Sequence, residues 1–390
     1  MSNIKISVIV PCYNVASLLP RGLDSLVNQT LDDIEIICVD DKSTDDTLMV
    51  LNEYASRDPR IRVIALDENS GAAVARNAGM DVATGQWLAF MDADDYVDSD
   101  YYEKMYDTAI QNPDADIIKS DAKITEYDGS RRFDDRQMAR IRMFGKWRFM
   151  YQWWTGMYRG DMIRENNIRF PSEIISGQDV VFLTECVAVA SKIALCPNAF
   201  YHYIRRTDSL DEQILPPAKI ESKLNATMLM CDKYNTSDMS DDDYFACYHD
   251  RFVMAKSMFD RNTLYECKCR VAETLINLYK NCRDKYKLID MHLSFCPDAR
   301  DYVPYIQSYD VANLVKYFTG ACPGGAQSGK RPESRHQVLL FNCIPIAQVN
   351  NGPRIKMLRV FGIQVLKIKH SGTSFKMYVL YIPIIRIKKK

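Results

Sequence analysis

The sequence predicts an α/β fold with a parallel sheet, followed by a mainly helical region and a small, basic, β-rich tail. Three observations predict this order. Short β-branched runs alternate with helical patterns over the first 120 or so residues, as is typical of parallel sheets. From Leu215 to about Phe318 apolar positions recur among charges with no strand signals. After Glu333 there is no Asp or Glu, and apolar runs alternate with basic residues.

Five short apolar runs are the predicted strands of the sheet. They are Lys5–Val10, Ile34–Val39, Ile61–Leu66, Trp87–Met91 and Asp116–Lys119. In an open parallel sheet, ligands bind beyond the carboxyl ends of the strands. The first four of these ends are all polar, and three of them carry carboxylates. The sequence therefore predicts a binding site along this edge.

Three helical patterns separate the first four strands. In the first, Leu19–Val27, leucines recur at helical spacing. Ser43 and Asp46 are spaced as a capping box, which predicts that the second helix begins at Ser43. The third, Ala72–Val82, is rich in small residues, which allows close contact between helix and sheet.

The composition is that of an ordinary globular protein. Of 390 residues, 47% are hydrophobic and 26% are charged, which excludes wholesale disorder and leaves room for two or three domains. The 12 cysteines are scattered without disulfide-framework or zinc spacing, so we expect reduced, buried thiols. The N-terminus lacks signal-peptide features, and no apolar run approaches the roughly 18 to 20 residues that span a bilayer. We therefore expect a cytoplasmic location.

The near-neutral total charge hides a strong asymmetry. Up to Arg335 the chain carries 40 Lys and Arg against 51 Asp and Glu, whereas the segment after it carries ten basic residues and no acidic one. A basic tail on an acidic body predicts a surface for an anionic partner.

The basic tail contains an internal sequence repeat. Val360–Lys369 aligns with Leu380–Lys388, and Phe341–Ile346 is a weaker third copy. Alternation places Lys367 and Lys369 on one strand face. We expect 336–390 to rest on an anionic membrane surface, with the alternative that it is a small β-meander with a solvated basic face. No nucleic-acid motif accompanies the charge, so no nucleic-acid partner is expected.

Asp92, Asp94 and Asp95 form the most distinctive cluster, directly after an apolar strand. Three carboxylates within four residues repel one another unless a cation lies among them. In an extended chain Asp92 and Asp94 point the same way, and oxygen-only ligation suits Mg²⁺ or Mn²⁺. The alternative is a solvated acidic turn that caps the next helix.

Other polar side chains follow the neighbouring strands. Asp40 and Asp41 end the second strand, where a carboxylate accepts a base N–H or simply favours a helix N-terminus. Tyr13 ends the first strand, where its ring could stack on a base. Arg76 could reach a phosphate, or form a weak surface ion pair.

Taken in order, four segments resemble the family 2 glycosyltransferases, which have a GT-A nucleotide-binding fold. The matching segments are Val8–Asn14, Val39–Asp45, Asn69–Gly79 and Asp92–Asp95. The resemblance is close from Ile6 to about Asp121 and looser to about Leu210. One departure is Lys42, where many relatives have glycine.

The resemblance implies roles for individual residues at the strand ends. Tyr13 and Asp41 would recognise the base, expected to be uracil, while Asp92 would lie near the ribose. Asp94, with Asp92, would hold Mn²⁺ or Mg²⁺ on the diphosphate. The other nucleotide-binding residues implied are Pro11, Asn14, Asp40, Arg76, Arg205 and Arg206.

The resemblance also implies a catalytic base. Relatives often carry a Glu-Asp pair after an Asn-x-x-Phe stretch. Here Asn167–Phe170 is followed by Gln178 and Asp179. Asp179 is the expected base that deprotonates the acceptor hydroxyl, and the alternative is that it is a helix N-cap. Gln178 departs from the usual acidic residue.

The expected organisation follows. Residues 1–210 would be a glycosyltransferase domain, with a nucleotide half over about 1–120 and an acceptor half over about 121–210. A helical region (211–320), a linker (321–335) and the basic segment (336–390) come after it. Trp147, Trp153 and Trp154 are expected to pack in a core, with a sugar-stacking acceptor platform as the alternative.

The expected activity is metal-assisted, inverting transfer of a hexose or N-acetylhexosamine from a nucleotide-sugar, expected to be a UDP-sugar. The acceptor would be a hydroxyl of a surface polysaccharide or a lipid-linked glycan, at the inner face of the cell membrane. The alternative is a non-catalytic nucleotide-sugar-binding or scaffold protein with the same fold. A dinucleotide-binding oxidoreductase is excluded because no GxGxxG follows the first strand.

Overall fold

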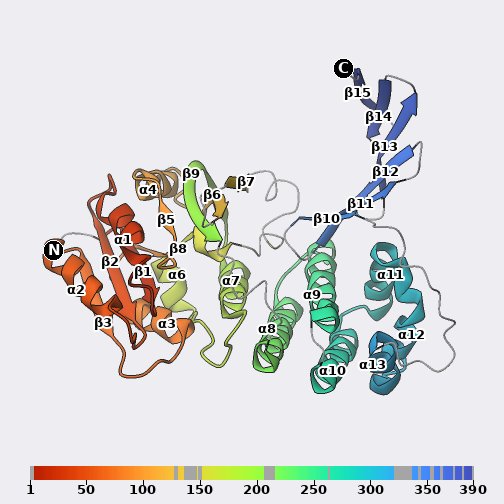
Figure 1. Ribbon diagram of the computed structural model, residues 1–390, viewed down its shortest axis with the longest axis horizontal. Coiled ribbons are helices and arrows are strands. Elements are labelled where there is room, and N and C mark those ends of the chain that lie inside the picture. The colour runs from red at the N-terminus through yellow and green to blue at the C-terminus, as the bar shows by residue number, and fades with distance from the viewer. Residues whose placement is uncertain are drawn as a thin grey trace. The chain divides into compact units, whose positions relative to one another are not determined.

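The computed structural model divides into two compact units, Met1–Asp243 and Tyr244–Lys390 (Figure 1). The structure describes residues 4–126, 131–135, 147, 152–205, 216–261, 264–319, 336–340, 344–351, 355–360, 363–371, 374–379 and 382–388. The predicted linker 321–335 lies outside the described residues.

Four parallel strands form one half of the sheet in the first unit. They are β1 (Ile6–Cys12), β2 (Ile34–Asp40), β3 (Ile61–Ala65) and β4 (Trp87–Phe90), in the spatial order β3-β2-β1-β4. The residues of β1, β2 and β4 are almost all buried, as expected of strands covered on both faces. These strands confirm four of the predicted ones to within two residues.

The five predicted strands are parallel to one another, since β6 (Ile117–Glu126) runs in the same direction as β4, but the other half of the sheet also contains antiparallel strands that the sequence did not predict. β8 (Gly156–Arg159) lies between β4 and β6 and is antiparallel to both, while β9 (Ile193–Arg205) is parallel to β6. Two edge strands, β5 (Tyr96–Val97) and β7 (Arg131–Asp135), pair antiparallel with β9 and β6. Antiparallel neighbours need no helical crossover, so strand orientation does not follow from the alternation of element types.

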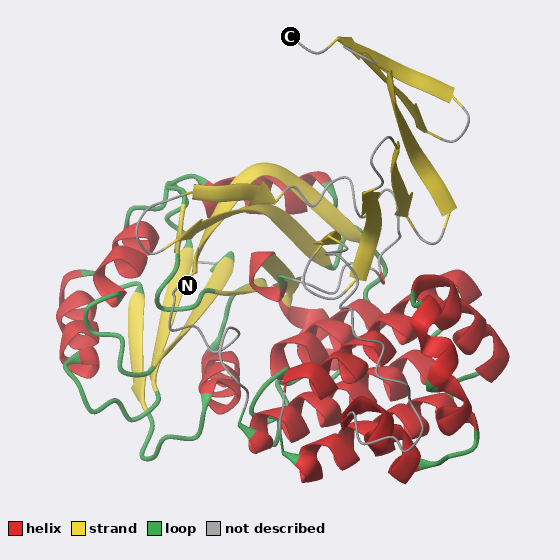
Figure 2. Cartoon of the chain, turned by 45° about the vertical axis from the view of Figure 1, so that its right-hand side comes forward, coloured by secondary structure: helices red, strands yellow, loops and turns green. Residues whose placement is uncertain are grey.

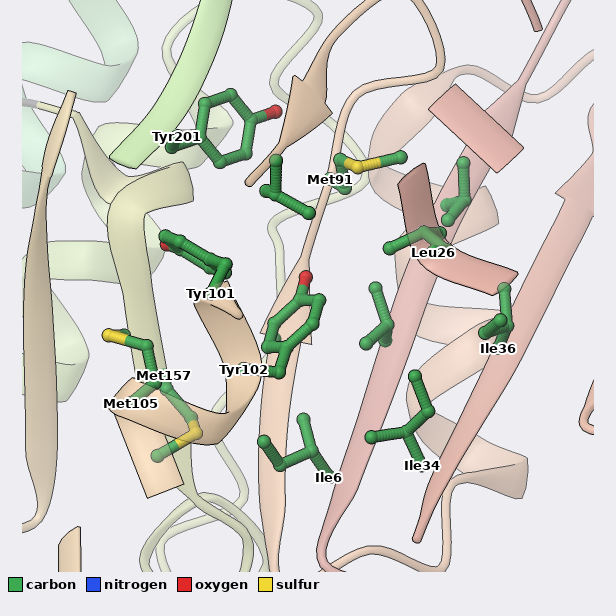
Figure 3. Close-up of a cluster of buried hydrophobic side chains, with 14 of the residues drawn as sticks. Ile6, Leu26, Ile34, Ile36, Met91, Tyr101, Tyr102, Met105, Met157 and Tyr201 are labelled. Carbon is green, nitrogen blue, oxygen red and sulfur yellow. The ribbon is translucent and has the colours of Figure 1, made fainter. Parts of the chain in front are cut away.

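Helices cover both faces of the sheet. α1 (Leu19–Val27), α2 (Thr47–Arg57) and α4 (Tyr101–Gln111) enclose one core with alternate residues of β1 and β2 (Figure 3). The members of this core include Ile6, Val8, Val10, Ile34, Ile36, Cys38, Leu19, Leu23, Leu26, Tyr101, Tyr102 and Met105. The opposite face of β1 and β2 packs on α3 (Ala72–Val82). The period-2 alternation of the strands thus separates two cores.

A glycine sets the distance between α3 and the sheet. A Cβ atom at Gly79 would lie 2.5 Å from Cγ2 of Ile9 and 3.4 Å from Cγ2 of Val39. The close contact expected from the small residues of this helix is therefore present, and it requires glycine at this position.

The second helix begins later than predicted. α2 starts at Thr47, and Asp45 receives hydrogen bonds from the Thr47 N–H (3.0 Å) and the Thr47 hydroxyl (2.6 Å). Ser43 instead accepts a hydrogen bond from the Asn14 N–H at 3.0 Å. The predicted capping box is wrong because Ser43 is bound to the loop that follows β1.

Three further helices of the first unit lie among the described residues. α6 (Gly160–Glu165) follows β8, α7 (Gln178–Val189) precedes β9, and α8 (Pro217–Thr236) packs against α7. A short 3₁₀ turn over Trp153–Thr155 precedes β8.

The helices of the region predicted as helical, 211–320, divide between the two units: α8 belongs to the first, and the helices from Tyr244 onward belong to the second (Figure 2). Its elements are α9 (Asp241–Arg261, of which Tyr244 onward belongs here), α10 (Tyr265–Asn281), α11 (Lys285–Phe295), the 3₁₀ turn Pro297–Asp301, α12 (Val303–Gln307) and α13 (Val311–Thr319). Among the described residues, no helix has the length and apolar character needed to cross a bilayer.

The tail forms a six-stranded antiparallel meander. Its strands are β10 (His336–Leu340), β11 (Ile344–Asn351), β12 (Ile355–Val360), β13 (Ile363–Ser371), β14 (Ser374–Val379) and β15 (Ile382–Lys388). The sequence repeat corresponds to alternate strands of this sheet. Its three copies contain the first residues of β11, β13 and β15, which are Ile344, Ile363 and Ile382. This confirms the predicted β-rich tail.

Candidate functional site

The ends of β1 and β2 are joined by a network around Asn14. This residue has a positive φ of 50°. Its side-chain oxygen accepts the Thr44 N–H at 2.7 Å, while its own N–H donates to Ser43. Asn14 therefore links the two strand ends, and Tyr13 beside it is 47% exposed. The predicted base-stacking ring lies uncovered at this edge, next to Pro11 at the end of β1.

Lys42 occupies a strained backbone position in the same edge. Its φ is 59°, in the left-handed region that favours glycine. This explains in physical terms why glycine suits this place in the motif. The exposed Lys42 keeps the same turn at a conformational cost.

The two aspartates that follow β2 have different partners. Both oxygens of the buried Asp41 accept backbone N–H groups, from Ser70 and from Gly71, each at 2.8 Å. One oxygen of the buried Asp40 accepts the Ser43 N–H at 3.2 Å. Its other oxygen, Oδ1, is buried and has no hydrogen-bond partner among the described residues. Asp41 thus holds the loop that enters α3, and each of its oxygens retains a second lone pair for a ligand.

Arg76 of α3 lies at the centre of the site. Its Nη2 donates to Asp92 Oδ1 at 2.9 Å. Its guanidinium packs 4.5 Å from the centre of the Trp153 ring and 5.3 Å from that of Phe170. Nε and Nη1 are buried with no hydrogen-bond partner in the described part of the chain. Two unpaired cationic N–H groups are costly, so this arrangement favours an anionic ligand.

Asp92 to Asp95 form a turn, so the extended conformation in which Asp92 and Asp94 would point the same way is not present. The Asp95 N–H donates to the Asp92 carbonyl at 3.0 Å, and Arg21 of α1 donates to the Asp94 carbonyl at 2.7 Å. A Cβ atom at Gly22 would lie 2.9 Å from the Asp95 carbonyl oxygen, so α1 and this turn are in close contact.

Asp95 is a structural residue. It is fully buried and accepts the Tyr201 hydroxyl and the Ile204 N–H, both at 2.8 Å. The Tyr201 oxygen in turn accepts the Asp92 N–H at 3.1 Å. Burial raises the pKa of Asp95 well above its usual range, and the charges of Asp94 and Asp92 add to the increase. Asp95 therefore ties the acidic turn to β9.

The remaining pair, Asp92 and Asp94, fits a divalent ion only in part. In the described ranges, no three acidic, histidine or cysteine side chains are placed to enclose a metal. Two carboxylates completed by waters and substrate phosphates are, however, the usual ligands of Mg²⁺ in nucleotide sites. An oxygen-only donor set of this kind fits Mg²⁺ or Mn²⁺ bound together with a diphosphate.

Asp179 lies in the first turn of α7. Gly177, with a φ of 97°, is the N-cap of this helix, so Asp179 does not cap it. Burial raises the pKa of Asp179, the positive charge of Arg76 opposes the increase, and the negative charge of Asp92 adds to it. The half-buried Asp179 carboxylate is thus close enough to the Arg76–Asp92 pair for its charge to interact with both.

The sequence analysis missed one residue that joins the two halves of the site. Asn77, next to Arg76, donates to the Phe170 carbonyl at 2.8 Å and accepts the Phe170 N–H at 3.0 Å. These hydrogen bonds connect α3 to the segment that leads into α7. Both residues lie inside the motif segments already singled out, but their pairing across 93 positions has no local signal.

The remaining predicted residues are two arginines and three tryptophans. The backbone of Arg205 ends β9, while its side chain and all of Arg206 lie outside the described residues. Trp147 and Trp153 are buried, as expected for core residues. Trp154 is half-buried and stacks on Tyr203, with ring centres 5.3 Å apart.

Comparisons with known proteins identify the family and the fold that this chain resembles. The family model described as Glycosyl transferase family 2 matches residues 7–171. The uncharacterized glycosyltransferase EpsJ of Bacillus subtilis is 28% identical over 287 residues, which are 69% of this chain and 83% of EpsJ. The poly(ribitol-phosphate) beta-glucosyltransferase of Bacillus spizizenii is 34% identical over 233 residues, 52% of this chain but only 33% of that enzyme.

Among solved structures, S. aureus TarS 1-349 in complex with UDP has the same fold. The TM-score is 0.63 at 21% identity, and the match covers 81% of this chain and 92% of that one.

Proposed function

Because residues 7–171 belong to glycosyl transferase family 2, we propose that this chain transfers a sugar from a UDP-sugar to a hydroxyl group of a surface polysaccharide or a lipid-linked glycan. The sugar would be a hexose or an N-acetylhexosamine. One observation carries the proposal: Arg76, Asp92 and Asp179 converge on one edge of the sheet, with two buried N–H groups of Arg76 unpaired. A glycan-building role is supported by the beta-glucosyltransferase relative.

The nucleotide would bind over the ends of β1 and β2. The exposed Tyr13 ring would stack on uracil, and Asp41 would accept a base N–H beside the loop that it holds. Pro11, Asn14 and Asp40 would line this part of the pocket. Arg76 orients Asp92 through their ion pair, and the buried guanidinium offers positive charge to the diphosphate.

Asp92 and Asp94 would hold Mn²⁺ or Mg²⁺ against the diphosphate. When bound, the ion would neutralise the negative charge that develops on the leaving group. Arg205 and Arg206 are proposed as further phosphate contacts.

Asp179 would act as the general base. Its carboxylate would take the proton of the acceptor hydroxyl while that oxygen bonds to the anomeric carbon. In the same displacement the bond from this carbon to the diphosphate breaks, with inversion, and UDP leaves with the electron pair. Burial makes the carboxylate a stronger base, and a positioned base contributes roughly 10²- to 10⁴-fold in rate.

The tail supports a proposal about location. Its register pairs Lys369 with Lys376 and Lys376 with Arg386, and directly paired residues of antiparallel strands share a face. A face carrying these basic positions suits an anionic lipid surface, at about 1 kcal/mol per basic residue. This supports our proposal that the enzyme acts in the cytoplasm, at the inner face of the cell membrane.

The alternative function is a non-catalytic nucleotide-sugar-binding or scaffold protein. The observation that favours it is Gln178 at the start of α7, since an amide cannot act as a base. The two functions differ in whether a UDP-sugar is consumed, for instance by slow hydrolysis to free sugar.

Calorimetric titration with UDP, with and without Mn²⁺, tests the proposal. We expect Mn²⁺-dependent binding by the native chain, loss of the metal dependence in Asp94→Asn, and near-normal UDP affinity but no turnover of UDP-glucose or UDP-N-acetylglucosamine in Asp179→Asn. Full turnover by either variant would remove that residue from its role. UDP binding without any consumption of either sugar nucleotide would favour the scaffold function.

A further inference from the structure

Helix α8 lies beyond the segment that the family model matches, yet it contacts the turn that presents Asp179. The Ser222 hydroxyl of α8 accepts the Ser176 N–H at 2.9 Å and lies 3.4 Å from the Ser176 carbonyl oxygen, to which it donates. One buried side chain therefore pairs both backbone groups of Ser176, the residue before the N-cap of α7.

A second contact fixes the same turn. A Cβ atom at Gly177 would lie 3.0 Å from the Cβ of Ala226, and the positive φ of Gly177 is itself one that other residues rarely adopt. Ala226 lies one helical turn after Ser222, so the two residues share a face of α8. Both are buried. This face thus packs closely on the backbone that enters α7.

A third contact extends along the two helices. Lys233 of α8 pairs with Glu185 of α7 at 2.5 Å. Ser176, just before α7, contacts Ser222, and Glu185 further along α7 contacts Lys233 further along α8. The two helices therefore run in the same direction. Partly exposed ion pairs contribute little free energy, so Ser222 and Ala226 are the contacts that fix the turn.

We propose that Ser222 is a positioning residue for the glycosyl transfer. By pairing both backbone groups of Ser176, it holds the Ser176–Asp179 turn so that the Asp179 carboxylate stays in reach of the acceptor hydroxyl. Without the hydroxyl, the turn gains freedom, and a misplacement of about 1 Å at a catalytic group can cost about 100-fold in rate. This inference rests on the proposed role of Asp179 and adds α8 to the elements that build the active site.

Ser222→Ala in the full chain tests the proposal by two measurements. Amide hydrogen exchange reports on the turn without requiring activity, and we expect the segment 172–182 to exchange about tenfold faster. Release of UDP from UDP-glucose or UDP-N-acetylglucosamine reports on the chemistry. We expect kcat to fall by about 10- to 100-fold, with the UDP dissociation constant within twofold of the native value.

Two further variants act as controls. Thr227→Val removes a hydroxyl of the same helix that donates to the Lys223 carbonyl within α8, and we expect near-native exchange and kcat. Ser222→Thr keeps the hydroxyl and should restore most of the activity.

Each other outcome overturns the proposal. Unchanged exchange or unchanged kcat in Ser222→Ala would show that the hydroxyl positions nothing. A matching loss in Thr227→Val, or loss of UDP affinity together with kcat, would indicate general weakening of the fold. If the native chain binds UDP but never consumes either sugar nucleotide, the proposed function itself fails, and the positioning role fails with it.

Discussion

At the residue scale, the three neighbouring aspartates Asp92, Asp94 and Asp95 carry the same side chain but lie in different environments. Asp92 is paired with Arg76, Asp94 lies in a turn whose backbone is held by Arg21, and Asp95 is buried against β9. Repulsion among three carboxylates is relieved partly by turning one of them into the core. A count of acidic residues therefore overstates the number available to a metal.

Asp95→Asn should destabilise the first unit while leaving the nucleotide site in place. The amide offers one acceptor to two donors, Tyr201 and Ile204, and an unsatisfied buried group costs about 1 to 3 kcal/mol. All four tryptophans of the chain lie in the first unit, so urea unfolding followed by tryptophan fluorescence measures this loss. Asp94→Asn is the matched variant, and equal losses of stability in both would contradict the division of roles.

At the element scale, the contact of α3 with the sheet makes glycine more favourable than alanine at one helix position. Alanine normally stabilises a helix interior by about 1 kcal/mol relative to glycine. At Gly79, however, the new methyl would lie 2.5 Å from the buried Ile9 side chain, and overpacking costs about 1 to 3 kcal/mol. The position of Arg76 and Asn77 depends on this helix, so the contact supports the site as well as the core.

We therefore expect Gly79→Ala to lower the free energy of unfolding by up to about 2 kcal/mol, the overpacking cost less the gain in helix propensity. The same fluorescence-detected urea titration measures it. Ala78→Gly on the same helix is the control, with an expected loss of about 1 kcal/mol from propensity alone. A gain in stability for Gly79→Ala would show that α3 has room to move from the sheet.

At the scale of the whole molecule, the two units should respond differently to acid. In the second unit, His249 Nε2 and His292 Nδ1 are 3.1 Å apart, and His292 Nε2 lies 2.6 Å from the Tyr302 hydroxyl. Burial lowers the pKa of His249 to about 4. Burial, with the charges of His249 and Lys256, lowers the pKa of His292 to about 3. Both rings are therefore neutral in the folded state.

The direction of the pH effect follows from these values. Below about pH 6.5 the unfolded chain binds protons that the folded chain does not, so stability is complete above pH 6.5 and falls toward pH 4, by about 1.4 kcal/mol per pH unit for each histidine. Urea unfolding followed by far-ultraviolet circular dichroism at pH 7.5 and 5.5 should show this loss. Replacing both histidines with glutamine should flatten the dependence, and an unchanged slope would exclude these residues as its cause.

Local sequence patterns account for part of the fold and of the site. The strands β1 to β4, the helices between them, and the positions of Tyr13, Asp40, Asp41 and Asp92 at strand ends followed from local patterns. The N-terminus of α2 did not, because Ser43 is bound to Asn14, 29 positions away. The orientation of β8 did not either, since a four-residue run carries no sign of direction.

The sequence by itself determined the order of elements and the chemistry at each strand end, because hydrophobic periodicity and turn residues act between near neighbours. Only the tertiary structure decided which carboxylate turns inward, that Asn77 holds Phe170, and that Ser222 holds the turn before Asp179. These pairings join segments 46 to 106 positions apart. They form because buried polar groups need hydrogen-bond partners, and the partners are the groups that packing of the chain brings close. Spacing along the sequence does not predict which groups these are.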